Sequence, residues 1–125
     1  MLGRTALVLF LGMFVILQPI EAQKKERDAR ANAAYAAGEF HDAIDLYKKV
    51  VNKLSDEKKA EAYFIIGECY RILGESRQAG LWYKKALQMD YQNPILFLRY
   101  GQSLMKYEKY EDAVEQFETY RDLVP

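Results

Sequence analysis

The side chains that most often carry out chemistry are scarce and scattered in this chain of 125 residues. His41 is the only histidine and Cys69 the only cysteine. A structural zinc site takes about four nitrogen, sulfur or carboxylate ligands, and neither residue has a nitrogen or sulfur partner for one. Cys69 also has no partner for an intramolecular disulfide, so we interpret it as a small buried apolar side chain.

Acidic side chains are common, but their spacing is that of solvated helix surfaces. Glu61, Glu68, Glu75 and Glu108 are spread along the chain, and no partner is placed to raise the pKa of one carboxyl group. No glycine-rich phosphate-binding loop is present in the sequence. We therefore predict that the protein is not an enzyme, and that it has no catalytic residue, cofactor or metal.

The charge balance gives no support for binding to nucleic acid. The chain carries 18 basic and 18 acidic residues, whereas nucleic-acid binding usually needs a concentrated basic surface. Positions 24–30 are rich in lysine and arginine, but Glu26 and Asp28 interrupt them. We interpret this segment as the solvated start of a helix, and we predict no nucleic-acid partner.

Small residues recur along the chain at two nearly constant steps, of 36 and then 34 residues. They form two sets in phase, twelve positions apart, and each member of the downstream set has an aromatic residue four positions later. The downstream set is Ala43, Ala79 and Ala113, and the upstream set is Ala31, Gly67 and Gly101. Two sets in phase predict one structural unit used three times, as in a solenoid.

Each unit is predicted to be a pair of antiparallel helices. In the middle unit, apolar and small residues follow the helical period over positions 60–72 and again over 79–87. Gly74 lies between the two runs, where a glycine tolerates the positive φ at which many helices end. The two extra residues of the longer step fall within 52–57, with Ser55 as the candidate N-cap of the next helix.

This pattern resembles the tetratricopeptide repeat, a helical hairpin of about 34 residues. The middle repeat carries the resemblance best, and the first repeat is degenerate where Arg27 and Arg30 replace large apolar residues. The resemblance implies an all-α fold, a right-handed α-solenoid of three helix-turn-helix repeats at about 24–57, 60–93 and 94–125. The residues that carry it in the middle repeat are Gly67, Tyr70, Gly74, Ala79, Tyr83 and Ala86.

The first 22 residues have a different pattern. Arg4 precedes an uninterrupted apolar stretch over 6–17, and Pro19 follows it shortly before Ala22. This is the layout of a secretory signal peptide, so we predict a cleaved signal peptide at 1–22 and a repeat domain at 23–125. The apolar stretch is shorter than the roughly 20 residues of a membrane span. An uncleaved anchor is the alternative, and the leader is the only predicted membrane contact.

A narrower resemblance concerns the cell envelope. The leader together with the runs YFIIGECYR, QAGLWYKKAL and the final LVP is similar to the exported amino-terminal repeat segment of certain bacterial outer-membrane-associated proteins. In that group, a domain resembling the OmpA C-terminus follows the repeats, and some members serve secretion machinery. The resemblance implies an exported protein of a Gram-negative bacterium, periplasmic or outer-membrane-associated, with a role in envelope assembly.

In the tetratricopeptide family the first helix of each repeat lines a concave groove, and this implies a non-enzymatic adaptor that binds a protein or peptide partner. A subclass grips C-terminal carboxylates with a polar clamp, but only Asn32 and Arg99 match it here, so we expect a more apolar groove. The alternative for its apolar members is packing against a neighbouring helix. The groove positions are Asn32, Tyr35, Phe64, Glu68, Arg71, Ile72, Ile95, Leu98, Gln102 and Met105.

The last repeat presents an apolar face with no capping helix after it in the sequence. Its residues are Val114, Phe117, Tyr120 and Leu123. We expect a partner chain or a homodimer contact to cover this face, or further protein to follow Pro125. The competing functions are therefore a structural, self-associating subunit and the N-terminal fragment of a larger OmpA-like envelope protein.

Overall fold

The computed structural model describes residues 27–125, and the predicted signal peptide lies outside them. The described residues form six α-helices and one short 3₁₀ helix, with no strand among them. The helices are α2 (Ala29–Ala36), α3 (Phe40–Val50), α4 (Asp56–Ile72), α5 (Ser76–Gln88), α6 (Ile95–Lys106) and α7 (Tyr110–Leu123), with the 3₁₀ helix at Val51–Lys53.

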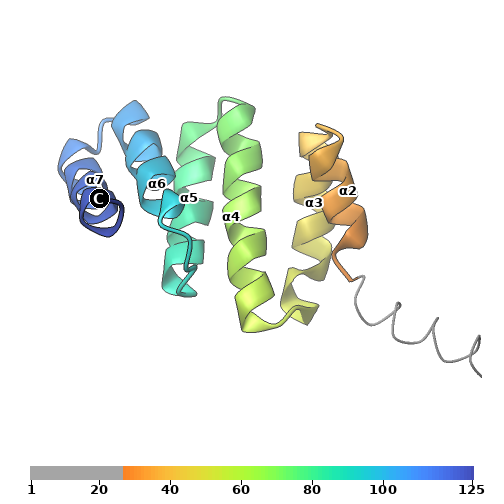
Figure 1. Cartoon of the computed structure of the whole chain (residues 1–125). Coiled ribbons are helices and arrows are strands. Elements are labelled where there is room, and N and C mark those ends of the chain that lie inside the picture. Colours follow the sequence, from red (N-terminus) through yellow and green to blue (C-terminus); the bar gives the residue numbers. More distant parts are fainter. Residues whose placement is uncertain (1–26) are drawn as a thin grey trace, which may run out of the picture.

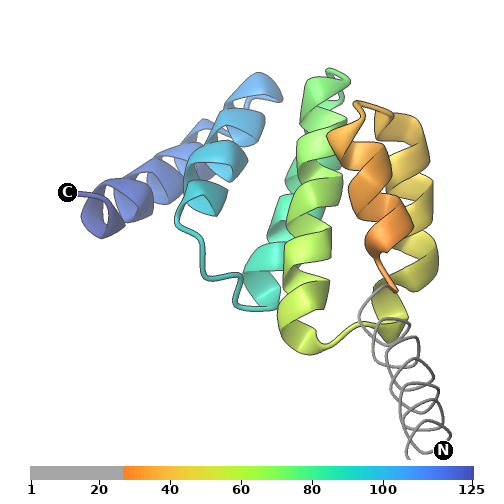
Figure 2. The same cartoon turned by 45° about the vertical axis from the view of Figure 1, so that its right-hand side comes forward.

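Consecutive helices pack as three hairpins, α2 with α3, α4 with α5 and α6 with α7 (Figure 1). The hairpins stack in chain order, because α3 contacts α4 and α5 contacts α6. Figure 2 shows the same succession from a second side, with the chain reversing direction from each helix to the next. The predicted all-α solenoid of three helical hairpins is therefore confirmed.

The turns within the first two hairpins contain a glycine with positive φ, as expected from the sequence for Gly74. Gly38 and Gly74 follow the first helices of repeats one and two at φ values of 76° and 80°. These left-handed conformations end the helices without the crowding that a Cβ atom would cause. In the third repeat the equivalent position is Glu108, which adopts φ 67°.

Glu108→Gly is expected to raise the free energy of unfolding by about 0.5–1 kcal/mol. Relief of left-handed crowding contributes about 1–2 kcal/mol, and the greater freedom of glycine in the unfolded chain removes about 0.4–1 kcal/mol of it. Urea unfolding of the two proteins measures the difference. Glu118→Gly, at an exposed site inside α7, is the control and should lower stability by about 1 kcal/mol. A loss of stability in Glu108→Gly would contradict the prediction.

The connection between the first and second repeats spans residues 51–55. The 3₁₀ helix at Val51–Lys53 continues α3 before α4 begins at Asp56. Ser55 is the N-cap of α4, and its Oγ accepts a hydrogen bond from the backbone N–H of Lys58 at 3.4 Å. The cap expected from the sequence is confirmed. The connection is five residues long, one shorter than the connection at 89–94, so the predicted loop insertion is wrong. The helix α4 begins eleven residues before Gly67, whereas α6 begins six residues before Gly101, and this longer first helix takes up the extra residues.

The core alternates large rings with small residues. Tyr47 and Tyr83 are almost fully buried, at 1% and 0% exposure. A Cβ atom at Gly67 would lie 2.6 Å from the ring of Tyr83, and one at Gly101 would lie 2.6 Å from the ring of Phe117. Both glycines are therefore needed for the close approach of an aromatic ring from the paired helix, as the two sets of small residues predict.

Cys69 lies in the core between the first two repeats, fully buried and unoxidised. Burial, followed by the charge of the nearby Glu68 carboxylate, raises the pKa of its thiol from an ordinary 9.0 to about 11. The raised pKa means that the neutral thiol stabilises the fold fully below about pH 9. This contribution is lost as the pH rises from about 9 to about 11.

Alkylation of Cys69 is expected to be at least about a hundredfold slower in the folded chain than in urea near neutral pH. A pKa higher by about two units lowers the thiolate fraction by about that factor, and burial slows the reagent further. Iodoacetamide labelling followed by mass spectrometry, repeated up to pH 10, gives both rates. Equal rates in the folded and unfolded chains would contradict the prediction.

Candidate functional site

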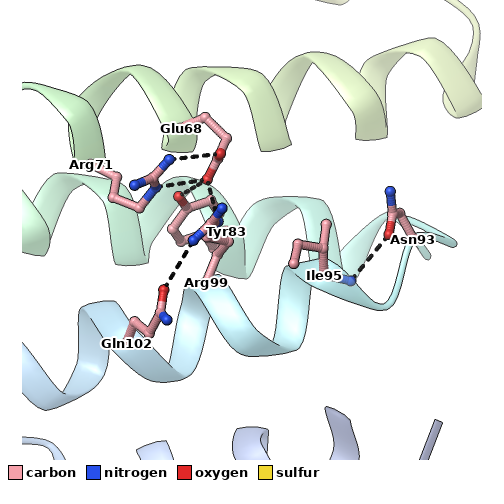
Figure 3. A network of polar contacts seen from close by, with 7 residues as sticks. All are labelled: Glu68, Arg71, Tyr83, Asn93, Ile95, Arg99 and Gln102. Carbon is pink, nitrogen blue, oxygen red and sulfur yellow. Dashed lines mark hydrogen bonds and ion pairs between the residues drawn. The ribbon is translucent and has the colours of Figure 1, made fainter. Parts of the chain in front are cut away.

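The candidate site lies mainly on the first helices of the second and third hairpins, where a carboxylate, two guanidinium groups and a phenol meet. Glu68 and Arg71 come from α4, Tyr83 from α5 and Arg99 from α6 (Figure 3). Tyr35 of α2 is close enough for the charges of Glu68, Arg71 and Arg99 to influence its hydroxyl, whose pKa is raised mainly by burial. The network itself therefore comes from the second and third repeats, and Tyr35 of the first repeat lies near its charges.

Glu68 is the centre of this network and is only 8% exposed. Its Oε1 accepts hydrogen bonds from the Tyr83 hydroxyl at 2.5 Å and from Nε of Arg71 at 3.0 Å. Its Oε2 accepts from Nη2 of Arg71, also at 3.0 Å. Nε of Arg99 lies 3.5 Å from Oε1 as an ion pair, without a hydrogen bond. One carboxylate thus links the second repeat to the third.

The electrostatics of the network keep its groups in fixed roles. The hydrogen bond to Glu68 raises the pKa of Arg71 further, so this arginine stays charged. Burial, and then the hydrogen bond to Glu68, raises the pKa of Tyr83 above its ordinary 10.0, so its hydroxyl remains a donor. Two guanidinium groups face one carboxylate, and the network carries one surplus positive charge. Its surroundings consequently favour an anionic group.

An open cavity of about 410 Å³ adjoins the network at the C-terminal ends of α4 and α6. Gln102 connects the two, because its Oε1 accepts a hydrogen bond from Nη1 of Arg99 at 3.3 Å. The cavity is lined by Arg71, Ser76, Gln102, Ser103, Met105 and Lys106. Most of these side chains are hydrogen-bond donors, and Met105 adds apolar area.

A profile of the tetratricopeptide repeat family matches residues 29–94. The chain belongs to the tetratricopeptide repeat family. Tetratricopeptide repeat protein 8 of Caenorhabditis elegans is 29% identical over 84 residues, which cover 67% of this chain and 16% of that protein. This tetratricopeptide repeat protein therefore matches only about a sixth of the length of its curated relative.

Two solved structures share the fold. One, described as the second TPR of Spaghetti (RPAP3) bound to HSP90 peptide SRMEEVD, gives a TM-score of 0.70 at 23% identity and covers 86% of this chain and 96% of that one. The other, PcrH in complex with the chaperone binding region of PopB, gives 0.68 at 22% identity and covers 82% of each chain. At these identities the likeness concerns the helical architecture.

The groove residues predicted in this tetratricopeptide repeat protein differ in how much surface they offer. Ile72 and Met105 are 44% and 49% exposed. Phe64 is 9% exposed, packs against Tyr83 and stacks on Tyr91 at 4.7 Å, so it serves the core and offers little surface to a partner.

The remaining predicted groove residues lie between these extremes. Ile95 and Leu98 on α6 are half-buried, and Ile95 packs against the core of the second repeat. Asn32 is exposed, and its Oδ1 accepts a hydrogen bond from the Tyr47 hydroxyl at 2.5 Å. Asp28, near Asn32 in the sequence, forms an ion pair with Lys58 at 3.5 Å. This end of the groove is therefore polar, and its polar side chains partly pair with one another.

Several site residues were not predicted from the sequence. Ser76, Ser103 and Lys106 line the cavity, and Tyr83 holds the Glu68 carboxylate. The spacing of Glu68 and Arg71, three residues apart on one helix, is a readable sign of an ion pair. No local sequence signal brings Tyr83 and Lys106 to the same site, because they come from different repeats.

The predicted C-terminal interface separates into two parts. Val114 and Leu123 are exposed at 52% and 53%. Phe117 and Tyr120 are half-buried, and the ring of Phe117 fills the space above Gly101. Val114 and Leu123 therefore offer the most surface of the four to another chain, and Phe117 is held within its hairpin.

Metal and membrane features are lacking in the part of the chain that the structure describes. Residues 27–125 hold no group of three histidine, cysteine, aspartate or glutamate side chains arranged to bind a metal ion. Over the same residues, no helix is both long enough and apolar enough to span a bilayer.

Proposed function

We propose that this tetratricopeptide repeat protein is a non-enzymatic adaptor that binds a peptide or protein partner in the concave groove of its three repeats. The observation that carries the proposal is the open cavity beside the Glu68 network, where exposed Met105 lies next to charged groups. A mixture of apolar area and a few fixed polar groups is typical of peptide-binding surfaces. Both structural neighbours were solved with bound peptides or protein segments, which supports the same use of the fold.

A photo-crosslinking amino acid placed in the groove tests the adaptor proposal. Introduced at Met105, it should capture a partner in living cells, because this exposed side chain lines the cavity. The same amino acid at Lys84, exposed on α5, is the matched control and should capture none. Equal capture at both positions, or capture at Lys84 alone, would contradict a groove-specific function.

We also propose that the protein is exported and acts in the periplasm or at the outer membrane of a Gram-negative bacterium, in envelope assembly. The pattern of residues 1–22 and the narrower resemblance to envelope proteins support this location. Cell fractionation with mass spectrometry of the N-terminal peptide tests it, with Gln23 expected as the first residue. A cytoplasmic chain that begins at Met1 would refute the proposal, and a membrane-bound one would indicate the uncleaved anchor.

Self-association through α7 is the second candidate, favoured by the exposed Val114 and Leu123. If it operates, Val114→Asp and Leu123→Asp should each abolish a concentration-dependent dimer in sedimentation velocity, because each adds a charge to an apolar contact. Leu81→Asp is the matched control, since Leu81 is 57% exposed on α5. A monomer at all concentrations, or dimer loss also in Leu81→Asp, would contradict a specific interface.

A further inference from the structure

We propose that the cavity at the C-terminal ends of α4 and α6 binds an acidic side chain of a peptide together with an adjacent apolar side chain. This inference rests on the proposed function of the groove and names the chemistry of its ligand. The charges around the cavity, the direction of its hydrogen bonds and its apolar wall each support it.

The charge balance at the cavity is positive. Its lining holds two cations, Arg71 and Lys106, and no acidic side chain. Glu68 offsets only one of the two arginines that surround it. Lys106 is exposed and forms no ion pair within residues 27–125. Together the network and Lys106 leave two positive charges without a carboxylate, although the whole chain is neutral.

The polar groups at the cavity are mainly donors. Arg71 uses Nε and Nη2 to hold Glu68, which leaves Nη1 for another acceptor. The amide oxygen of Gln102 accepts from Arg99, so its NH₂ group remains a donor. The hydroxyls of Ser76 and Ser103 can donate as well. A carboxylate accepts from all of these groups, and hydrogen bonds to a charged acceptor are stronger than neutral ones.

The size of the cavity and its apolar wall indicate a ligand larger than one carboxylate. A volume of about 410 Å³ is within the range of small-ligand pockets and exceeds what a single acidic side chain needs. Met105 lines it and is 49% exposed, and its flexible thioether adapts to varied apolar shapes. A peptide with an acidic residue next to an apolar one therefore matches both the hydrogen-bond donors and the apolar Met105 of the cavity.

Selection from a displayed library of random short peptides, with the full chain as bait, identifies a binding sequence. Fluorescence anisotropy then compares the selected peptide with an analogue in which glutamine replaces glutamate. We expect enrichment of glutamate or aspartate beside an apolar residue, and about tenfold weaker binding of the glutamine analogue. The affinity of the acidic peptide should also fall with salt, because the groove and its cations are solvent-accessible.

Variants at Lys106 test the cavity itself. Lys106→Glu should weaken the acidic peptide about five- to tenfold, since an exposed charge contact is worth up to about 1 kcal/mol and reversal adds repulsion. It should leave the glutamine analogue unchanged. Lys106→Met removes the charge without adding one and should give about half the effect in free energy. Lys84→Glu makes the same charge change on α5 and should alter neither peptide.

The outcomes separate this inference from the proposed function. Selected peptides without acidic residues, or an unchanged affinity in Lys106→Glu, would overturn the acidic specificity while groove binding stands. Preference for a phosphorylated serine over glutamate at the same position would also overturn it, in favour of a phosphoryl ligand. Failure to select any peptide would overturn both proposals. Loss of the acidic peptide in Lys106→Glu alone, with normal circular dichroism, supports the inference.

Discussion

Replacing Glu68 with glutamine is expected to lower the free energy of unfolding by about 2–3 kcal/mol. The carboxylate is 8% exposed and accepts hydrogen bonds from Arg71 and Tyr83, with Arg99 at 3.5 Å. Removing one partner of a buried ion pair costs about 3–5 kcal/mol. The two arginine side chains are 31% and 29% exposed, so water compensates part of that loss and reduces the expected value.

Urea unfolding followed by the fluorescence of Trp82, the only tryptophan, measures this change. Glu61→Gln is the matched control, because Glu61 is exposed on the same helix, and it should change stability by less than about 0.5 kcal/mol. Tyr83→Phe removes only one hydrogen bond to Glu68 and should cost about 1 kcal/mol. Equal effects of Glu68→Gln and Glu61→Gln would mean that the network does not stabilise the fold.

The fold of this chain was predictable because each repeat places a small residue of one helix against an aromatic ring of its paired helix. Gly67 and Tyr83 form such a pair, and the third repeat carries the equivalent Gly101 and Phe117. The backbone reversal at Gly74 and the cap at Ser55 are local signals of the same kind. Each of these features depends on residues within one hairpin, where spacing along the chain determines the contact.

The candidate site was less predictable because part of it joins different hairpins. The spacing of acidic residues suggested that Glu68 is solvated, and the family resemblance placed it in the groove, but neither indicates a buried carboxylate. Tyr83 from α5 reaches it within the same hairpin, but Arg99 from α6 approaches it only after the repeats stack. Phe64 is a similar case, since Tyr91 from the loop before α6 covers its ring.

Comparison of equivalent positions in the repeats argues against Phe117 as a residue of the C-terminal interface. Phe117 occupies the position of Tyr83 one repeat later, and its ring fills the space above Gly101 as Tyr83 does above Gly67. It is therefore committed to its own hairpin, even though the face around it is apolar. The close approach at Gly80 could not be predicted in this way. The side chain that approaches it is Tyr107 at the end of α6, and the two residues do not occupy paired positions of one repeat.

Gly67→Ala is expected to lower the free energy of unfolding by about 2 kcal/mol, although alanine is the better helix former. The new Cβ would lie 2.6 Å from two atoms of the Tyr83 ring, closer than packed carbon atoms approach. Tyr83 is 0% exposed, and its hydroxyl is held by Glu68, so the ring has little room to move. Overpacking costs about 1–3 kcal/mol and occasionally more, and it exceeds the gain of about 1 kcal/mol in helix propensity.

Alanine at the other two glycines that lie close to a ring should lower stability less than Gly67→Ala, and less at Gly80 than at Gly101. Gly101→Ala meets Phe117, whose half-buried ring in the last helix can shift, and we expect a loss of about 1 kcal/mol. Gly80→Ala meets chiefly the hydroxyl end of Tyr107, a half-buried and movable side chain, so the helix gain of about 1 kcal/mol should roughly cancel the clash. Urea unfolding of the three variants establishes the order.

A double-mutant cycle identifies the cause of the Gly67→Ala loss. Tyr83→Leu removes the ring that the new methyl group would meet, and alone it destabilises the protein by leaving a cavity. In the Tyr83→Leu background, Gly67→Ala should cost nothing or even stabilise, because only the helix preference of alanine remains. A coupling of about 2 kcal/mol between the two positions is expected. Additive effects would mean that the methyl group is accommodated elsewhere, and that Gly67 is not required for the approach of Tyr83.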